Sequence, residues 1–201
     1  MFPLGSVLFP HMPLMLRVFE PRYVEMLSFV LQEEPAEFGV VLIERGQEVG
    51  GGEKRFSIGT VARITELEAA DGFFALVARG GRRIEIAEWI DENPFPQADV
   101  RELPALAWDD SLEAQRDAAE LLVRQSLEAA SVHDEQLWSA SVELSDDLVE
   151  GCWQLAAIAP LGPLDQLALL RSETLEQLLT QLIELTEAAG QSLGAVWSDD
   201  T

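Results

Sequence analysis

The sequence predicts an α+β protein in which a small β-barrel or curled sheet with one or two helices is followed by an α-helical bundle. Three observations indicate this arrangement. Short runs rich in β-branched and aromatic residues, separated by turn residues, fill the first half of the chain. After Pro104, apolar residues recur at the spacing of amphipathic helices. The chain is 48% hydrophobic, enough for a substantial core. We therefore expect two domains, at residues 1–104 and 105–201.

The opening stretch LFPHMPLMLRVFEPRY predicts a strand, a tight corner and a helix. Prolines bracket its apolar segments, and prolines are tolerated at strand starts and at sheet edges. Pro21 suits the first position of a helix, and apolar residues then recur at helical spacing as far as Leu31. Glu20 and Arg22 flank this proline, and we expect them to form an ion pair. A structural role is thus favoured over a catalytic one, with a contribution to a binding surface as the alternative.

Further strands are expected between residues 38 and 103, with turn residues between them. Asp71-Gly72 is typical of a hairpin turn, and Gly80-Gly81 predicts another turn. Strands as short as these are typical of a small barrel or a strongly curled sheet. The expected strands are residues 38–43, 59–66, 73–78, 83–90 and 98–103.

The second half predicts four helices. Asp110 and Glu113 have the spacing of a capping box, and Ser172 and Gly190 are expected to cap the two ends of the last helix. Residues 134–145 fit no clear pattern. The expected helices are residues 110–131, 146–158, 163–170 and 172–190.

Several motifs resemble one known family. The segments FPLGSVLFP, FEPRY, GTVARI and GGRRIEI occur in this order. Together they resemble the N-terminal, substrate-binding domain of Lon proteases over roughly residues 1–190. The resemblance implies a β-barrel related to the PUA domain, followed by a helical bundle. It also implies a non-catalytic module that recognises exposed hydrophobic or unfolded protein segments.

The catalytic parts of a Lon protease are not expected in this chain. The segment GGGEKR at residues 50–55 lacks the spacing of a phosphate-binding loop and the Ser or Thr that follows its lysine. Lys54 is the single lysine of the sequence, which leaves little basis for a Ser-Lys dyad. We therefore expect a stand-alone domain with no catalytic residues and no cofactor.

Metal ligands are also scarce. The sequence has one cysteine, Cys152, and two histidines, His11 and His133. A lone cysteine is typically a buried apolar side chain, and two isolated histidines do not make a metal triad. The paired aspartates at 109–110 and 146–147 fit helix caps better than a calcium site. No metal site is expected.

Five apolar residues near turns are the candidate protein-binding residues. Since neighbours on a strand point to opposite faces, Phe73 and Phe74 cannot both face the interior. An exposed aromatic patch would suit recognition of unfolded chains, whereas packing in the core is the alternative for each residue. The candidates are Met12, Met15, Phe73, Phe74 and Phe95.

Charge bears on the partners. The formal net charge is −23, and such a field repels phosphate backbones and anionic lipid surfaces. We expect protein or peptide clients and, from the resemblance, a proteolytic ATPase as a further partner. No nucleic acid and no membrane are expected, and a cytoplasmic location is the default. RNA binding, as in PUA-related barrels, is the alternative, through a local patch of Arg79, Arg82, Arg83 and Arg101.

Overall fold

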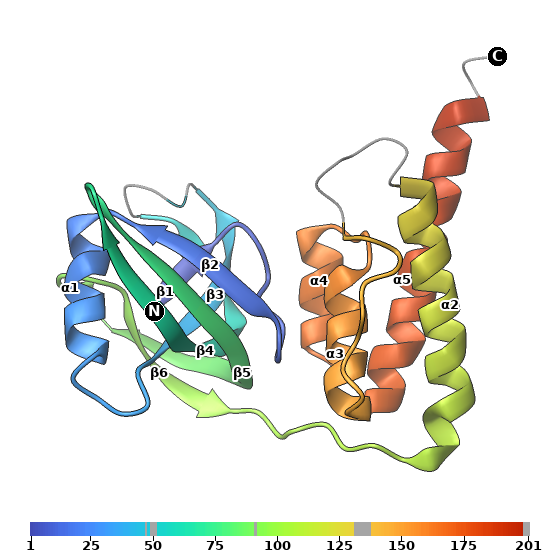
Figure 1. The fold of residues 1–201 in the computed structure, drawn as a ribbon, viewed down its shortest axis with the longest axis horizontal. Helices are drawn as coiled ribbons and strands as arrows, with labels where there is room; N and C mark the ends of the chain where they lie inside the picture. Colours follow the sequence, from blue (N-terminus) through green and yellow to red (C-terminus); the bar gives the residue numbers. More distant parts are fainter. Residues whose placement is uncertain (47, 49–51, 91, 131–137, 199–201) are drawn as a thin grey trace. The chain divides into compact units, whose positions relative to one another are not determined.

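The computed structural model describes residues 1–46, 48, 52–90, 92–130 and 138–198, with side chains described as far as Gln191. Within the chain, Met1–Ala105 and Leu106–Thr201 are two compact units (Figure 1). The first unit contains the strands and one helix, and the second contains the remaining helices.

The first unit is a mixed sheet of six strands with helix α1 (Pro21–Val30). The strands follow the order β1-β3-β4-β5-β2, and β6 pairs with β5 beside this path. The β1–β3 pair is parallel and the other pairs are antiparallel. The strands are β1 (Phe2–Leu4), β2 (Pro13–Val18), β3 (Glu37–Arg45), β4 (Lys54–Ala70), β5 (Phe73–Ile90) and β6 (Gln97–Glu102).

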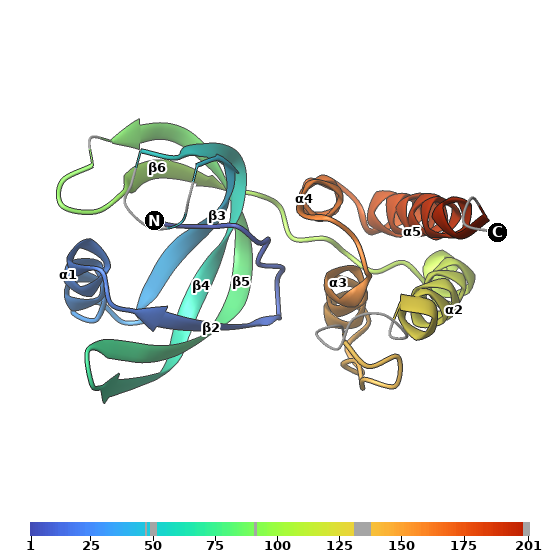
Figure 2. The ribbon, with the colours of Figure 1, turned by 90° about the horizontal axis from the view of Figure 1, so that it is seen from above.

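The sheet is curled but not closed. In the described part of the chain, β1 pairs with β3 and β2 pairs with β5, and these two edge strands do not pair with each other. Figure 2 shows how β4 and β5 curve. Hydrogen bonds tie the segment between β1 and β2 to the sheet: the Thr60 hydroxyl of β4 donates to the Leu8 carbonyl at 2.6 Å, and the His11 N–H donates to the Gly80 carbonyl of β5 at 2.8 Å. The prediction of an α+β fold is confirmed, with the curled sheet in place of the closed barrel.

Gly80 and Gly81 do not form the predicted turn. They lie inside β5, which runs unbroken through the two expected strands. A Cβ atom at Gly80 would lie 2.1 Å from the backbone oxygen of Phe9, so this glycine allows a close approach of two backbones. The predicted Asp71-Gly72 hairpin is confirmed, and Gly72 has a φ of +82°.

Helix α1 packs on the sheet through aromatic rings. Tyr23, Met26 and Leu27 form its buried face. The Tyr23 ring stacks on Phe2 of β1 with centroids 4.1 Å apart, and Phe2 in turn contacts Phe38 of β3 at 6.0 Å. Since α1 begins three residues after the end of β2, this packing also positions the end of β2.

The second unit is a bundle of helices around leucine-rich faces. The side chains of Leu178, Leu179 and Leu182 are fully buried, as are Val123 and Leu127 on a facing helix. The helices are η1 (Asp110–Leu112), α2 (Glu113–Ala130), α3 (Leu148–Ile158), α4 (Pro163–Leu170) and α5 (Leu175–Ser198).

Three helix caps of this unit differ from the predictions. In place of the predicted capping box of Asp110 and Glu113, Asp109 caps η1, where its carboxylate accepts from the Ser111 backbone N–H at 2.8 Å. The Thr174 hydroxyl accepts from the Gln177 backbone N–H at 3.1 Å, whereas Ser172 is buried, so Thr174 caps α5. Gly190 does not end α5, which continues to Ser198. A glycine on an open helix surface costs only about 1 kcal/mol, which the rest of the helix can absorb.

Candidate functional site

An exposed apolar strip lies on the outer face of β2 and β5. Residues directly opposite each other on antiparallel strands share a face. Met15 therefore lies beside Val77, and Arg17 beside Ala75. Met15 is 80% exposed, and Phe19, just beyond β2, is 55% exposed. We define the outer strip as Met15, Arg17, Phe19, Phe73 and Val77.

The strip contains a shallow hollow. Arg17, Phe19, Gly72 and Phe73 line a volume of about 410 Å³. The Arg17 guanidinium carbon lies 4.4 Å from the centroid of the Phe73 ring, which is a cation–π distance. An apolar side chain of a partner could enter this hollow and contact two phenylalanine rings.

The structure brings two of the five candidate residues together on the outer strip. Met15 and Phe73 lie there, whereas Phe74 lies on the opposite, inner face of β5, opposite Val18. Met12 and Phe95 are both buried. Their side chains pack inside the unit in this structure, so we leave these two residues out of the proposed surface.

Phe19 is the residue that sequence reasoning missed. Its place in the FEPRY motif favours a role in the structural corner before α1. The alternation along β2 was the available signal. Val18 faces inward, so the next residue, Phe19, is expected on the outer face, together with Met15 and Arg17. Phe29 of α1 is 60% exposed, but its ring contacts the buried Phe95 at 5.9 Å and not the strip.

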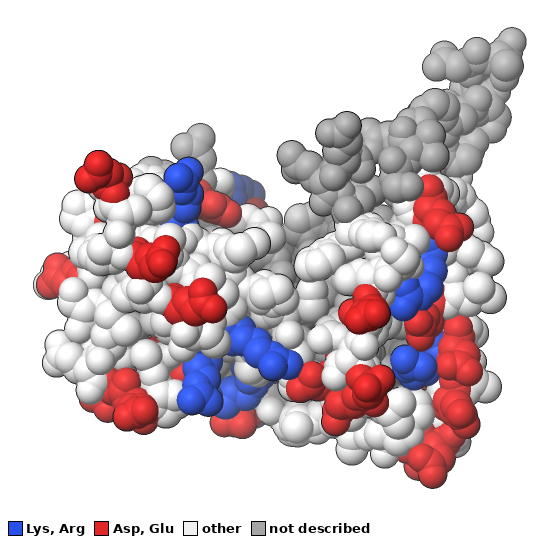
Figure 3. Space-filling view, in the orientation of Figure 1, with Lys and Arg blue, Asp and Glu red and all other residues white. Residues whose placement is uncertain are grey.

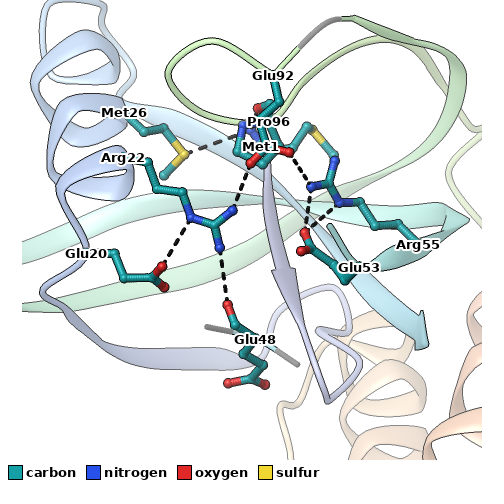
Figure 4. Close-up of polar contacts among 9 residues, drawn as sticks. All are labelled: Met1, Glu20, Arg22, Met26, Glu48, Glu53, Arg55, Glu92 and Pro96. Atoms are coloured by element: carbon teal, nitrogen blue, oxygen red, sulfur yellow. Dashed lines mark hydrogen bonds and ion pairs between the residues drawn. The ribbon is translucent and has the colours of Figure 1, made fainter. Parts of the chain in front are cut away.

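Apart from the outer strip, a set of charged residues ties the corner before α1 to the sheet (Figure 4). We define the charge cluster as Glu20, Arg22, Glu53, Arg55 and Glu92. Arg22 donates to Glu20 at 3.2 Å and to Glu92 at 2.8 Å. Arg55 donates to Glu53 and to Glu92, each at 2.8 Å. Glu92 thus bridges two arginines from different elements, and the predicted Glu20–Arg22 ion pair is present.

The electrostatics of this cluster fit a structural role. Partial burial acts to raise the pKa of Glu92, but hydrogen bonds from Arg55 and Arg22 outweigh it and hold the pKa below its ordinary value. Burial raises the pKa of the Tyr23 hydroxyl nearby, with Arg22 opposing the shift. Burial lowers the pKa of the Met1 amino group, which donates to the Pro96 carbonyl, to about 5. The carboxylates are engaged by arginines and are poorly suited to proton transfer.

The lone cysteine also lacks the setting of a nucleophile. Cys152 is fully buried in α3, and burial raises the pKa of its thiol to about 11. Among the described residues, no group of three or more His, Cys, Asp or Glu side chains is placed to hold a metal ion. His133 lies outside the described residues. In the part of the chain that the structure describes, no helix is both long and apolar enough to cross a bilayer.

The arginines proposed for RNA are largely engaged with the protein itself. Arg82 donates to Glu37 at 2.7 Å, and Arg101 pairs with Glu85. Arg83 is 5% exposed, and burial lowers its pKa. Acidic side chains are dispersed over the visible face of each unit (Figure 3).

Two solved structures share the fold of this chain. A Lon N-terminal domain protein from Xanthomonas campestris matches with a TM-score of 0.62 at 24% identity, over 91% of this chain and 95% of that one. The N-terminal domain of a Mycobacterium avium complex Lon protease matches with a TM-score of 0.62 at 18% identity, over 92% and 96% of the two chains. At these identities the likeness shows the fold alone.

Sequence comparison establishes the family. The model of the ATP-dependent protease La (LON) substrate-binding domain matches residues 1–188, and the chain belongs to this family. The Lon protease of Anaeromyxobacter dehalogenans is 26% identical over 148 residues, which are 72% of this chain and 17% of that protein. The resemblance indicated by the sequence motifs is therefore confirmed, and a substrate-binding module is the class that the family defines.

Proposed function

We propose that this chain is a non-catalytic protein-binding module that recognises exposed hydrophobic or unfolded segments of client proteins through the outer strip. Family membership supports the substrate-binding part of this proposal. The observation that carries the finer part is the exposure of Met15 and Phe19 beside the hollow at Phe73. Large apolar side chains gathered on one exposed face are a common mark of a protein-interaction site.

The charges beside the strip favour protein clients over nucleic acids. Glu66 and Glu68 of β4 lie opposite Val77 and Ala75 and share the outer face of the sheet with the strip. An acidic row beside the strip, within a chain of net charge −23, repels phosphate groups. The proposal therefore excludes RNA as a ligand, and it places the proteolytic ATPase, where one is present, as the partner that receives the client.

Two matched variants of adjacent phenylalanines test this function. The ligand is a reduced and alkylated, permanently unfolded test protein. Phe73→Ser should weaken its binding more than about fivefold, while costing roughly 1 kcal/mol of stability, because Phe73 is half-buried on the outer face. Phe74 is also half-buried, but it lies on the inner face opposite the buried Val18, so Phe74→Ser should cost more stability, about 2 kcal/mol, and leave client binding unchanged.

The proposal requires that Phe73→Ser mainly weakens binding of the unfolded protein and that Phe74→Ser mainly lowers stability. Binding is measured by calorimetry at a temperature where each variant is folded, and stability is measured by urea unfolding. If Phe73→Ser binds the unfolded protein as tightly as the unsubstituted chain does, the outer strip is not the client site. Peptidase or ATPase activity of the purified chain, removed by a single substitution, would contradict the non-catalytic part.

A further inference from the structure

We propose that the client segment binds as an extended strand on the open edge of β2, with its alternate apolar side chains against the outer strip. This inference rests on the proposed function and adds the conformation and sequence pattern of the bound segment. It places the affinity partly in backbone hydrogen bonds and partly in contacts with Met15 and Phe19, in the manner of strand addition to a sheet edge.

The ladder between β2 and β5 shows which backbone groups face away from β5. The Gly80 N–H donates to the Met12 carbonyl at 2.8 Å, and the Gly80 carbonyl accepts from the His11 N–H at 2.8 Å. His11 and Met12 together thus oppose Gly80, as in a β-bulge, and Gly80 directs both of its backbone groups toward the β2 side. Hydrogen-bonded and non-hydrogen-bonded pairs alternate along an antiparallel ladder. The pairs Leu14–Ala78 and Leu16–Leu76 are therefore hydrogen-bonded. The intervening residues of β2 direct their N–H and C=O groups to the open edge.

The hairpin on the other side of β5 gives an independent check of this parity. Ala70 and Phe73 flank the two-residue turn, and the pair that closes such a hairpin is hydrogen-bonded. Phe73 thus directs its backbone toward β4, and the next residue, Phe74, directs its backbone toward β2. By the same alternation, the backbone groups of Ala78 also point toward β2. This agrees with the assignment of Leu14–Ala78 as a hydrogen-bonded pair.

The groups at the open edge are the N–H and C=O of Met15 and Arg17 and the C=O of Pro13. The proline has no N–H to satisfy, as is typical of an edge position. In the described part of the chain, no other strand pairs with this edge of β2. A client strand could therefore form about four backbone hydrogen bonds with Met15 and Arg17.

The burial of the inward side chains shows that the edge is open to a ligand. Leu14 and Leu16 face inward, yet both are only half-buried. Their cross-strand partners Ala78 and Leu76 are each 1% exposed on the same face. Since the pairs share a face, their difference in exposure comes from the lateral edge of β2. A strand added there would cover these two leucines and extend the core.

The chemistry of the edge defines the occupant. Met15 and Phe19 favour apolar client side chains at alternate positions, because residues opposite the edge share its outer face. The acidic row of Glu66 and Glu68 and the net charge of −23 disfavour acidic segments. The same charge opposes edge-to-edge pairing of two copies of this chain. The occupant is thus an extended, apolar, non-acidic segment of an unfolded polypeptide.

Backbone N-methylation tests this binding mode. The probe is the peptide acetyl-Lys-Leu-Thr-Leu-Thr-Leu-Thr-Leu-Lys-amide. It is compared with two isomers that each carry three N-methyl groups, either on the last three leucine nitrogens or on the three threonine nitrogens. Each isomer loses the donors of one peptide edge only. Loss of a hydrogen bond costs about fivefold in affinity, so one isomer should bind more than about tenfold more weakly than the other. The isomer whose donors face β2 is the one that loses affinity.

The outcomes distinguish this inference from the proposed function. Equal affinity of the three peptides, or equal losses in both isomers, would overturn strand addition while apolar client binding stands. Failure of the unmethylated peptide and of the unfolded test protein to bind would reject both.

A second measurement needs only the unmethylated peptide. Amide hydrogen exchange at Met15 and Arg17 should slow by more than about tenfold when the unmethylated peptide saturates the protein, because both N–H groups become hydrogen-bonded. The amides of Leu14 and Leu16 already lie in the ladder and serve as internal controls. Unchanged exchange at Met15 and Arg17 in the complex would overturn the inference. So would protection of these amides without peptide that grows with protein concentration, because a second copy would then occupy the edge.

Discussion

At the scale of single residues, Glu92 holds together parts of the first unit that are far apart in the sequence. Its two oxygens accept hydrogen bonds from Arg22, at the start of α1, and from Arg55, at the start of β4. Its side chain is 32% exposed, so solvent screens these interactions only in part. We expect the carboxylate to contribute on the order of 1 kcal/mol to the free energy of unfolding.

The contribution of Glu92 should depend on pH. Partial burial opposes ionisation, but the arginine hydrogen bonds prevail, so the folded state has the lower pKa. A carboxyl of this kind stabilises the fold above its unfolded pKa, near 4.5, and the contribution is lost as the pH falls through the folded pKa. We therefore expect Glu92→Gln to lower stability at pH 7 and to have a smaller effect as the pH falls below about 4.5.

Urea unfolding of the unsubstituted chain and the variant at several pH values measures this difference. Glu88→Gln is the matched control, since Glu88 is an exposed carboxylate on the same segment. The control should change stability by less than about 0.5 kcal/mol. A stability difference for Glu92→Gln that is the same at pH 7 and at pH 3.5 would contradict the proposed role of the carboxylate.

At the scale of elements, the course of β5 through Gly80 and Gly81 determines the shape of the sheet. The two glycines differ in their surroundings. A Cβ atom would lie 2.1 Å from a backbone oxygen at Gly80, and 3.4 Å from the nearest atom at Gly81. Backbone cannot move aside as a flexible side chain can. Gly80→Ala should therefore destabilise the protein by about 3 kcal/mol or more.

Gly81→Ala is the matched control for Gly80→Ala. Its Cβ would make an ordinary contact with the Val61 carbonyl, so stability should change by less than about 1 kcal/mol. Thermal unfolding of both variants measures the contrast. Equal melting temperatures for the two variants would show that β5 does not approach Phe9 as described.

The elements also show how far the sequence could predict the structure. Helices α1, α3 and α4 could be placed because Pro21, Asp147 and Pro163 mark their starts with local chemistry. The continuity of β5 could not, because a glycine pair has the same local signal in a turn as at a close approach of two backbones. The reason for Gly80 lies in Phe9, about 70 residues away in the chain.

The candidate site was predictable in part for the same reason. Alternation along a strand is local, and it placed Phe73 and Phe74 on opposite faces. Which face is outer depends on the partners across the sheet, and these are set by the pairing of β2 with β5. The burial of Met12 and Phe95 likewise comes from packing between distant segments, for which the sequence has no local signal.

At the scale of the whole molecule, the acidic charge and the apolar strip select ligands in different ways. A net charge of −23 keeps the chain soluble and repels polyanions. The proposed function rests on contact of the strip with apolar, non-acidic segments. Binding of clients should therefore depend on apolar contact area far more than on ionic attraction.

The dependence of affinity on salt separates apolar contact from ionic attraction. The dissociation constant of the unfolded test protein is measured by calorimetry from about 0.05 to 0.5 M sodium chloride, a range over which screening becomes strong. If apolar contact dominates, affinity should change by less than about threefold, and single-stranded RNA should not bind in the middle of the range. A steep loss of client affinity with salt, or retention of RNA with a log-log slope of several units, would contradict it, because such slopes report released counterions and not apolar contact.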